Sequence, residues 1–417
     1  MTPTPSIPML TIAAMATLAG SALAQNNHPL DRILIDTDLN QHPIRLVAIE
    51  DHAITAIDST GESRSIPFDQ FLALTPSGPW SADPSEQLTV LGRGGIASRP
   101  GAIELTDGQR LAGAASVVRV DDQSVAWVHP QLGIVRTPID TIERITMPRV
   151  MPLSEQSRPL PIENVDVVRL ANGDTLHGFV ISVGSETEIE LESGSTISVP
   201  TASIDQLTLA NETSAPSGTV VWLSDGSVIA IQSFEHSDSP SQTTCILQPD
   251  SFQEPFDTSP ASEANSPKQP IRLEVDLDSI TAINVDAHRL IPLASISPTS
   301  TGRDVILDDT VHAILGAKPI LLPGPMRTTW TLPHNTRAIA MVAELPLEAR
   351  AWGDVNLIIS IDGTQRQTLH FNADTPQATI RLDAPGARTL GITLEQGPFG
   401  PIQSRIRLHQ ALISVDR

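Results

Sequence analysis

A turn of Asp-Gly or Asn-Gly between apolar residues recurs three times in the first two thirds of the chain. It lies within residues 105–113, 170–178 and 223–229, and an apolar residue follows each glycine within three positions. These dipeptides favour two-residue type I′ hairpins, in which both central residues need a positive φ. A supersecondary signal that returns along a chain indicates a repeat architecture. The pattern therefore predicts a chain built from repeated small hairpin-based units.

The ends of these segments repeat as well. The spacing of Pro138, Ile142 and Ile145 returns at three other places: Pro200, Ile204 and Leu207; Pro67, Phe71 and Leu74; and Asp276, Ile280 and Ile283. The glycine turns near the start of each segment and this spacing near its end together predict four related β repeats, at residues 31–75, 102–148, 165–210 and 218–285. The first of them lacks a clear Asp-Gly opening.

Each repeat of roughly 45 residues has room for four or five short strands. That is too few for a sandwich, and it fits a strongly bent sheet or small barrel of the SH3-like or Sm-like kind. Residues 235–270 are polar and rich in proline, so composition predicts a disordered insertion within the fourth repeat. Residues 76–101 and 148–162 are expected to be linkers.

The pattern changes at residues 287–417, where apolar runs become longer and more regularly spaced. Five or more strands over this length predict a two-sheet β-sandwich. The predicted fold class is therefore all-β, with tandem small β-barrel-like repeats followed by a C-terminal, jelly-roll-like β-sandwich.

Several short segments of this C-terminal region share an order and composition: Thr-Trp-Thr-Leu-Pro at 329–333, Trp-Gly-Asp-Val-Asn at 352–356, and the runs at 388–394 and 397–413. In these segments the region resembles the NPCBM family of carbohydrate-binding modules associated with glycoside hydrolases. The resemblance covers residues 287–417. It implies a jelly-roll-like sandwich and a capacity to bind glycans.

Sugar sites pair an aromatic platform with polar groups that hydrogen-bond to hydroxyls. The chain has no tyrosine, which leaves few candidate platforms. Trp330 alternates with apolar residues and is expected in the core, whereas Trp352 stands beside Gly353 in an expected loop. Trp352, Asp354 and Asn356 are therefore the predicted ligand-binding residues. The oxygens of Asp354 and Asn356 would also suit calcium, although no cofactor is predicted.

No sequence motif indicates catalysis or a bound metal. The chain lacks the Gly-x-Ser-x-Gly, His-Glu-x-x-His and Gly-Lys-Ser/Thr patterns, and its histidines are scattered. Cys245 is the only cysteine, so neither an internal disulfide nor a cysteine-based zinc site can form. Its polar surroundings predict an incidental loop residue. No catalytic and no metal-binding residue is therefore predicted.

Acidic residues outnumber basic ones by 48 to 26, which gives a formal charge of −22. That charge repels phosphate backbones, so nucleic acid and anionic membrane surfaces are poor partners. Residues 1–24 contain a short apolar run followed by Ala22 and Ala24 at signal-peptidase spacing, which predicts a signal peptide. No later apolar stretch has the length of a membrane span. The expected location is the periplasm, the cell envelope or the exterior.

These observations favour an exported, non-catalytic binding or scaffold protein whose C-terminal module contacts carbohydrate. A structural assembly protein of the cell envelope, with protein–protein contacts only, is the first alternative. A polysaccharide hydrolase is the second. The expected partner is a glycan or an envelope protein.

Overall fold

The part of the chain that the structure describes folds almost entirely into antiparallel β-sheets. The computed structural model describes residues 30–416 except 78–88, 91–95, 115–116, 122–123, 130–131, 153–163, 238, 240, 249–270, 309–312, 398–399 and 401–402. In this part the only helices are short 3-10 turns, so the predicted all-β class is confirmed. None of those turns has the length or apolarity to cross a membrane. The predicted signal peptide and most of the predicted insertion lie outside the described residues.

Four groups of strands, here called units 1 to 4, precede the sandwich. Unit 1 contains β1 (Asp31–Asp36), β2 (Gln41–Ile49), β3 (Ala53–Asp58), β4 (Ser63–Pro67), η1 (Phe68–Gln70) and β5 (Phe71–Pro76). Unit 2 contains β8 (Gly101–Leu105), β9 (Arg110–Ala114), β10 (Val117–Asp121), β11 (Ser124–His129), β12 (Gly133–Pro138), η2 (Ile139–Thr141) and β13 (Ile142–Thr146). Unit 3 contains β15 (Asp166–Leu170), β16 (Thr175–Val183), β17 (Glu186–Leu191), β18 (Thr196–Pro200), η3 (Thr201–Ser203) and β19 (Ile204–Thr208). Unit 4 contains β20 (Thr219–Leu223), β21 (Val228–His236), β22 (Gln242–Leu247), β23 (Arg272–Asp276) and β24 (Ile280–Asn284).

In each unit the first strand pairs with both the second and the last strand. The long second strand of units 1, 3 and 4 carries a register shift partway along, at Leu46/Ala48, Val180/Ser182 and Ile231/Ser233. A bulge bends a strand and increases its twist, so one strand serves both halves of a curved sheet. The sheets curl in this way but are not closed barrels.

The turns between the first two strands differ from the predicted type. In units 2, 3 and 4 the glycine has a positive φ (81°, 91° and 87° at Gly108, Gly173 and Gly226), but the preceding Asp or Asn does not. Asp225 instead accepts a hydrogen bond from the Ser227 N–H at 2.8 Å, and the other two turns repeat this contact. The turns are therefore three-residue turns closed by glycine, which are the next commonest hairpin connection. The type I′ prediction is wrong at these positions.

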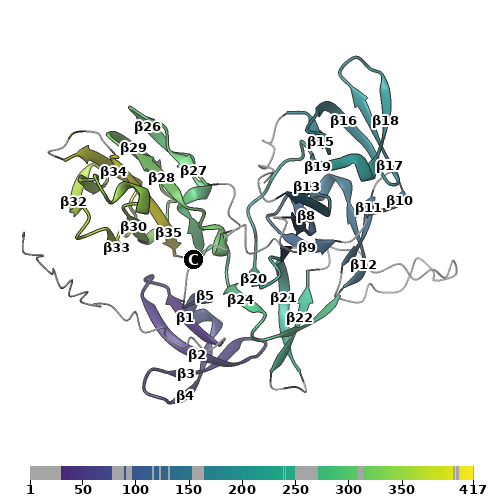
Figure 1. Cartoon of the computed structure of the whole chain (residues 1–417). Coiled ribbons are helices and arrows are strands. Elements are labelled where there is room, and N and C mark those ends of the chain that lie inside the picture. The colour runs from purple at the N-terminus through teal and green to yellow at the C-terminus, as the bar shows by residue number, and fades with distance from the viewer. Residues whose placement is uncertain are drawn as a thin grey trace, which may run out of the picture.

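The units pair out of chain order. The last strand of unit 1 pairs with the last strand of unit 4, Leu74 opposite Ile283, and the last strands of units 2 and 3 pair with Ile145 opposite Leu207. Units 2 and 4 then meet where Arg110 lies opposite Val228. One hydrophobic cluster runs through all four units. Figure 1 shows unit 1 below the sandwich, with units 2 and 3 on the far side of β20 and β24.

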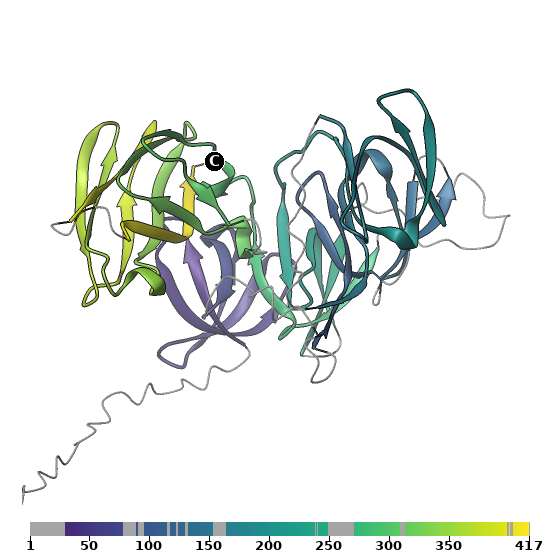
Figure 2. The same cartoon turned by 45° about the horizontal axis from the view of Figure 1, so that its top comes forward.

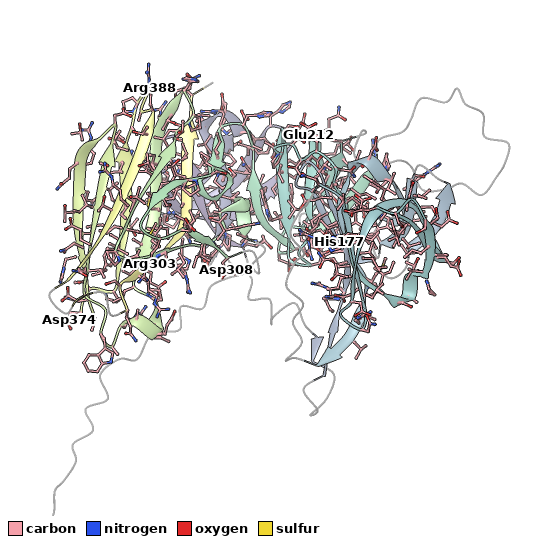
Figure 3. The ribbon with its side chains drawn as sticks, turned by 90° about the horizontal axis from the view of Figure 1, so that it is seen from above. His177, Glu212, Arg303, Asp308, Asp374 and Arg388 are labelled. Atoms are coloured by element: carbon pink, nitrogen blue, oxygen red, sulfur yellow. The ribbon has the colours of Figure 1, made fainter. Side chains whose placement is uncertain are left out.

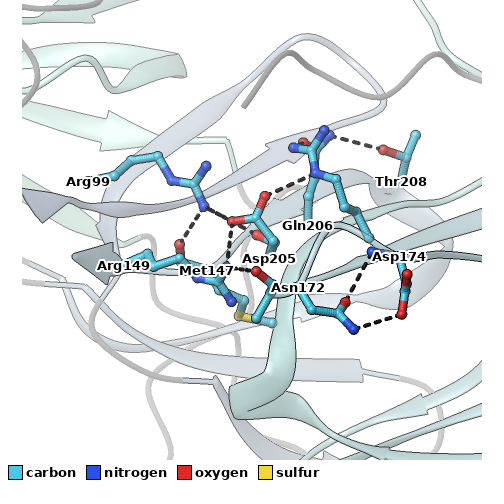
Figure 4. Close-up of polar contacts among 10 residues, drawn as sticks. Arg99, Met147, Arg149, Asn172, Asp174, Asp205, Gln206 and Thr208 are labelled. Atoms are coloured by element: carbon cyan, nitrogen blue, oxygen red, sulfur yellow. Dashed lines mark hydrogen bonds and ion pairs between the residues drawn. The ribbon is translucent and has the colours of Figure 1, made fainter. Parts of the chain in front are cut away.

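A buried ion cluster holds two connecting strands against unit 3 (Figure 4). A small sheet joins β6 (Thr89–Val90), β7 (Ile96–Arg99) and β14 (Arg149–Pro152), and its register sets Arg149 directly opposite Arg99. Like charges in that position repel. The Asp205 carboxylate, 3% exposed, offsets the repulsion: it lies 2.6 Å from Arg99, 3.0 Å from Arg169 and 3.6 Å from Arg149.

Part of the expected polar insertion is a core strand. Residues 242–247 form β22, which lies between β21 and β23, so the prediction of disorder is wrong there. Alternate residues of β22 face the hydrophobic core, and Cys245 is 2% exposed among them. The expectation of an incidental loop cysteine is therefore also wrong. The polar residues on either side of β22 suggested a loop, although the strand between them is short and buried.

Two sheets form the C-terminal sandwich (Figure 2). One sheet contains β25 (Leu290–Pro292), β27 (Ile306–Leu307), β28 (Ile320–Pro323), β30 (Thr336–Glu344), β33 (Gln377–Asp383) and β35 (Arg405–Val415). The other has the order β26 (Thr299–Thr301), β29 (Met326–Thr331), β34 (Thr389–Gln396), β31 (Val355–Ile361) and β32 (Thr364–Phe371). The connections include η4 (Leu293–Ser295), η5 (Ile314–Gly316) and η6 (Leu347–Ala349). Trp330, 1% exposed, lies in the shared core, and the predicted sandwich is confirmed.

The sandwich and unit 1 share a separate apolar cluster. Ile35 and Leu72 of unit 1 pack there with Leu412 of β35 and Leu315 of η5. Leu39 and Leu315 both have a positive φ, 61° and 58°, and each is 3% exposed within this cluster. Leucine adopts that backbone only where surrounding packing compensates the strain. The contact between unit 1 and the sandwich therefore fixes the local conformation of both partners.

Candidate functional site

The predicted residues Trp352, Asp354 and Asn356 lie at one end of the five-stranded sheet of the sandwich. Trp352 follows η6 in a tight turn, in which the N–H groups of Trp352 and Gly353 donate to the Ala349 carbonyl at 3.3 and 2.7 Å. Gly353 allows this turn because a Cβ there would meet the Ala349 carbonyl and Leu345. The chain then enters β31, which starts at Val355.

The Trp352 side chain is 70% exposed, whereas Trp127 and Trp330 are essentially buried. Large aromatic side chains usually contribute to a core, where burial yields about 25 cal/mol per Å² of apolar surface. Exposed Leu347 lies five residues earlier in the same connection, at 76%. This connection therefore presents unburied apolar surface beside the polar residues that follow it.

Asp354 is held against the neighbouring strand end. Its backbone carbonyl accepts the Gly397 N–H at 2.8 Å, and a Cβ on Gly397 would collide with the Asp354 carboxylate. The Asp354 side chain is 15% exposed, and its Oδ1 is buried without a hydrogen-bond partner. A buried polar atom left unpaired costs about 1–3 kcal/mol, and more when it is charged. Asp354 is one of several residues with such an atom, and its Oδ1 is enclosed by the chain rather than open to solvent.

His370 belongs to the same cluster, although no sequence pattern pointed to it. It lies directly opposite Asn356 in the β31–β32 ladder, and its Nδ1 is 3.0 Å from Asn356 Oδ1. Its Nε2 is 3.7 Å from Asp354 Oδ1, which is beyond hydrogen-bond length. The cluster therefore combines one exposed indole ring with a carboxylate, an amide and an imidazole.

The position of His370 opposite Asn356 could not be predicted by counting residues outward from the turn between β31 and β32. Asp362 and Gly363 both have a positive φ (49° and 75°), so this hairpin has the predicted two-residue type I′ geometry. A regular ladder from that turn would set Leu369 opposite Asn356. A register shift after Ile359 moves His370 there instead.

The arrangement is suited to binding a polar, uncharged molecule with apolar patches. The indole face offers a stacking surface, while the carboxylate and amide oxygens accept hydrogen bonds from hydroxyl groups. Within the part of the chain that the structure describes, no group of three or more His, Cys, Asp or Glu side chains has metal-site geometry. Asp354 and Asn356 alone would give a cation too few ligands.

Figure 3 identifies the ends of the sandwich. Arg303 and Asp374 lie toward one end and Arg388 toward the other. Asp374 follows β32, which ends beside the start of β31, so it marks the end of the sheet that carries Trp352.

No family model and no curated protein sequence matches the chain, so the NPCBM resemblance remains a prediction. Matches to solved structures are weak. A CBM51 module from Clostridium perfringens GH95, in complex with methyl-galactose, is 10% identical over 30% of this chain and 99% of that chain, with a TM-score of 0.26. Tandem CBM51 modules of Sp3GH98 from Streptococcus pneumoniae SP3-BS71 are 8% identical over 90% and 93%, with a TM-score of 0.27.

A xylan-binding domain from CBM22 is 16% identical over 28% of this chain and 86% of that chain, with a TM-score of 0.20. Scores this low leave the function to be argued from the residues of the chain itself.

Proposed function

We propose that this chain is an exported, non-catalytic binding protein whose C-terminal sandwich binds carbohydrate at Trp352, Asp354 and Asn356, with His370 as a fourth contact. In this proposal the sugar stacks on Trp352 and donates a hydroxyl hydrogen bond to the solvent-exposed part of the Asp354 carboxylate. The four units form the platform that carries the sandwich in the periplasm, the cell envelope or outside the cell.

The observation that carries the proposal is a tryptophan that is 70% exposed, two residues before a carboxylate that is held at the same strand end and is partly exposed. The exposed indole has a cost to the free chain because it leaves aromatic surface in water. A sugar removes that cost because its apolar C–H faces cover the ring, while its hydroxyl groups donate to the exposed part of the carboxylate. Asn356 and His370 add orienting polar groups on the adjacent strands.

A thermal-shift screen of the purified protein against a glycan panel tests the proposal. We expect at least one glycan to raise the unfolding temperature saturably, because ligand that binds only the native state stabilises it by mass action. Trp352→Ala should abolish that shift. Phe179→Ala is the matched control, since Phe179 is an exposed aromatic on unit 3, at 55%, and should leave the shift intact.

If no glycan shifts the unfolding temperature, the carbohydrate proposal fails and an assembly protein with protein contacts becomes the working hypothesis. Reducing-end release in the same mixtures would instead support a polysaccharide hydrolase. A shift that survives both Trp352→Ala and Asp354→Ala would place the sugar elsewhere on the molecule.

A further inference from the structure

The Trp352 cluster continues sideways across the outer face of the five-stranded sheet. Glu395 of β34 lies directly opposite Asn356, and Asn356 lies directly opposite His370. Directly opposed residues in antiparallel strands share a face. The three polar side chains therefore form one row across β32, β31 and β34, and Asp354 lies beside its first member, with Oδ1 3.7 Å from His370 Nε2.

A surface groove begins where that row ends. Its volume is about 630 Å³, and its lining includes Glu395 together with Thr393, Arg327, Pro325, Gly302 and Thr301. The register sets Thr393 opposite Arg327, and Arg327 opposite Thr301. Glu395 thus belongs both to the row and to the groove, so the two surfaces are continuous.

The groove is shallow, and its lining combines apolar surface from Pro325, Met326 and Leu394 with polar groups whose charges balance. Arg327 supplies its cation, Glu395 its anion, and Thr301 and Thr393 its hydroxyl groups. Among the described residues, no side chain forms an ion pair or a hydrogen bond with the Arg327 guanidinium or the Glu395 carboxylate, whereas the Thr301 hydroxyl donates to the Arg327 backbone carbonyl at 3.4 Å. The groove therefore offers a free donor and a free acceptor but no net charge. Such a surface matches a neutral polyhydroxylated chain better than an anion or a cation.

The dimensions exceed what one sugar needs. Five strands at the usual spacing of ~4.8 Å span about 19 Å from β32 to β26. A single pyranose stacked on Trp352 would leave the groove between β34 and β26 empty.

We infer that the ligand is a neutral, linear oligosaccharide whose chain runs from Trp352 along the His370–Asn356–Glu395 row into the groove at Arg327 and Thr393. The inference rests on the proposed function and adds to it the class of ligand: an extended neutral polysaccharide segment rather than a terminal sugar. Trp352 and Asp354 bind one end unit, and the groove binds units further along the chain.

Titration calorimetry of the whole protein with neutral gluco-, galacto-, manno- and xylo-oligosaccharides of increasing length tests the inference. We expect one series to bind, with affinity rising about tenfold or more from monosaccharide to tetrasaccharide, the factor contributed by about one further net hydrogen bond. Arg327→Ala should reduce this ratio of tetrasaccharide to monosaccharide affinity to near one. Arg388→Ala, at the opposite end of the sandwich, should leave the ratio unchanged.

Two other results have distinct meanings. If a monosaccharide binds as tightly as its tetrasaccharide, or Arg327→Ala leaves the ratio intact, the site takes a single sugar and the inference is wrong while the proposed function stands. If no oligosaccharide binds and Trp352→Ala changes nothing, the proposed function and the inference both fail. Tighter binding of uronic-acid oligomers than of neutral ones would also overturn the inference, because Arg327 would then recognise an anion.

Discussion

Arg337 of the sandwich donates a hydrogen bond from Nε to Asp38 Oδ1 of unit 1 at 2.6 Å, across 299 residues of sequence. Arg381 donates to the Asp38 carbonyl at 2.8 Å, so the β1–β2 turn contacts two strands of the sandwich. Beneath these contacts lies the apolar cluster that contains Leu39 and Leu412. Unit 1 and the sandwich are therefore packed together rather than joined only by chain.

The apolar part of this contact should contribute more stability than the ion pair. Leu412 is 2% exposed, so Leu412→Ala should lower the free energy of unfolding by about 2–4 kcal/mol. Asp38→Ala should cost at most about 1 kcal/mol, because both partners are about 40% exposed and solvent screens the pair. Urea denaturation of both variants measures the difference. Equal losses would show that the contact is mainly electrostatic.

The Asp205 cluster predicts a defined dependence of stability on pH. Burial alone would raise the pKa of Asp205, but Arg99 and Arg169 together lower that pKa below its ordinary value of 3.8. A lowered folded-state pKa gives stability that is present above the unfolded pKa and is lost as the pH falls through the folded pKa. Asp205→Asn should therefore cost about 3 kcal/mol at pH 7, as breaking a buried ion pair does.

The cost of Asp205→Asn should shrink as the pH falls below about 4, because the carboxylate of the unfolded wild-type chain then takes up a proton that the folded protein, with its lowered pKa, binds only at lower pH. Urea denaturation of both proteins between pH 7 and pH 3 measures this. A cost that stays constant over that range would mean that hydrogen bonding, rather than charge, stabilises the cluster.

Cys245 should be chemically inert in the folded protein. Burial raises the pKa of its thiol to about 12, so almost none of the reactive thiolate exists at pH 8. An aromatic disulfide reagent should leave the native protein unmodified and should react with one thiol per chain in urea. Rapid stoichiometric reaction without denaturant would contradict the burial of β22.

Gly397→Ala should disable the site by displacing Asp354 while leaving every polar residue of the site unchanged in sequence. The new Cβ would occupy the position of the Asp354 carboxylate, so Asp354 must move. We expect the glycan-dependent thermal shift to be lost to the same extent as in Asp354→Ala. Gly363→Ala is the control for a strained glycine replacement on the same sheet that leaves Asp354 in place, because its Cβ meets open space although φ there is 75°. A full shift in Gly397→Ala would separate Asp354 from ligand binding.

The candidate site was only partly predictable from sequence. Trp352 followed by Gly353 indicated an exposed aromatic, because a tryptophan outside an alternating apolar run has no strand to bury it. His370 gave no comparable signal. Its position opposite Asn356 depends on a register shift within β31–β32, and a shift by one residue moves every later side chain to the other face.

The strained backbone at two leucines could not be predicted from the sequence either. Leu39 and Leu315 carry no residue-level signal for a positive φ, which local preference assigns to glycine and asparagine. Packing between unit 1 and the sandwich imposes it on both leucines. Cys245 was predicted to lie in a loop because its sequence neighbours are polar. It is buried instead, because its strand pairs with β21 and β23.

The sequence by itself determined the all-β class and the C-terminal sandwich. Period-two alternation and glycine turns act over a few residues, so they can be read locally. Tertiary structure alone decided that unit 1 pairs with unit 4 and unit 2 with unit 3, and that Asp354 faces His370 across a strand end. Exposed strand edges are chemically alike along a chain, and only the combined burial of distant residues selects which edges meet.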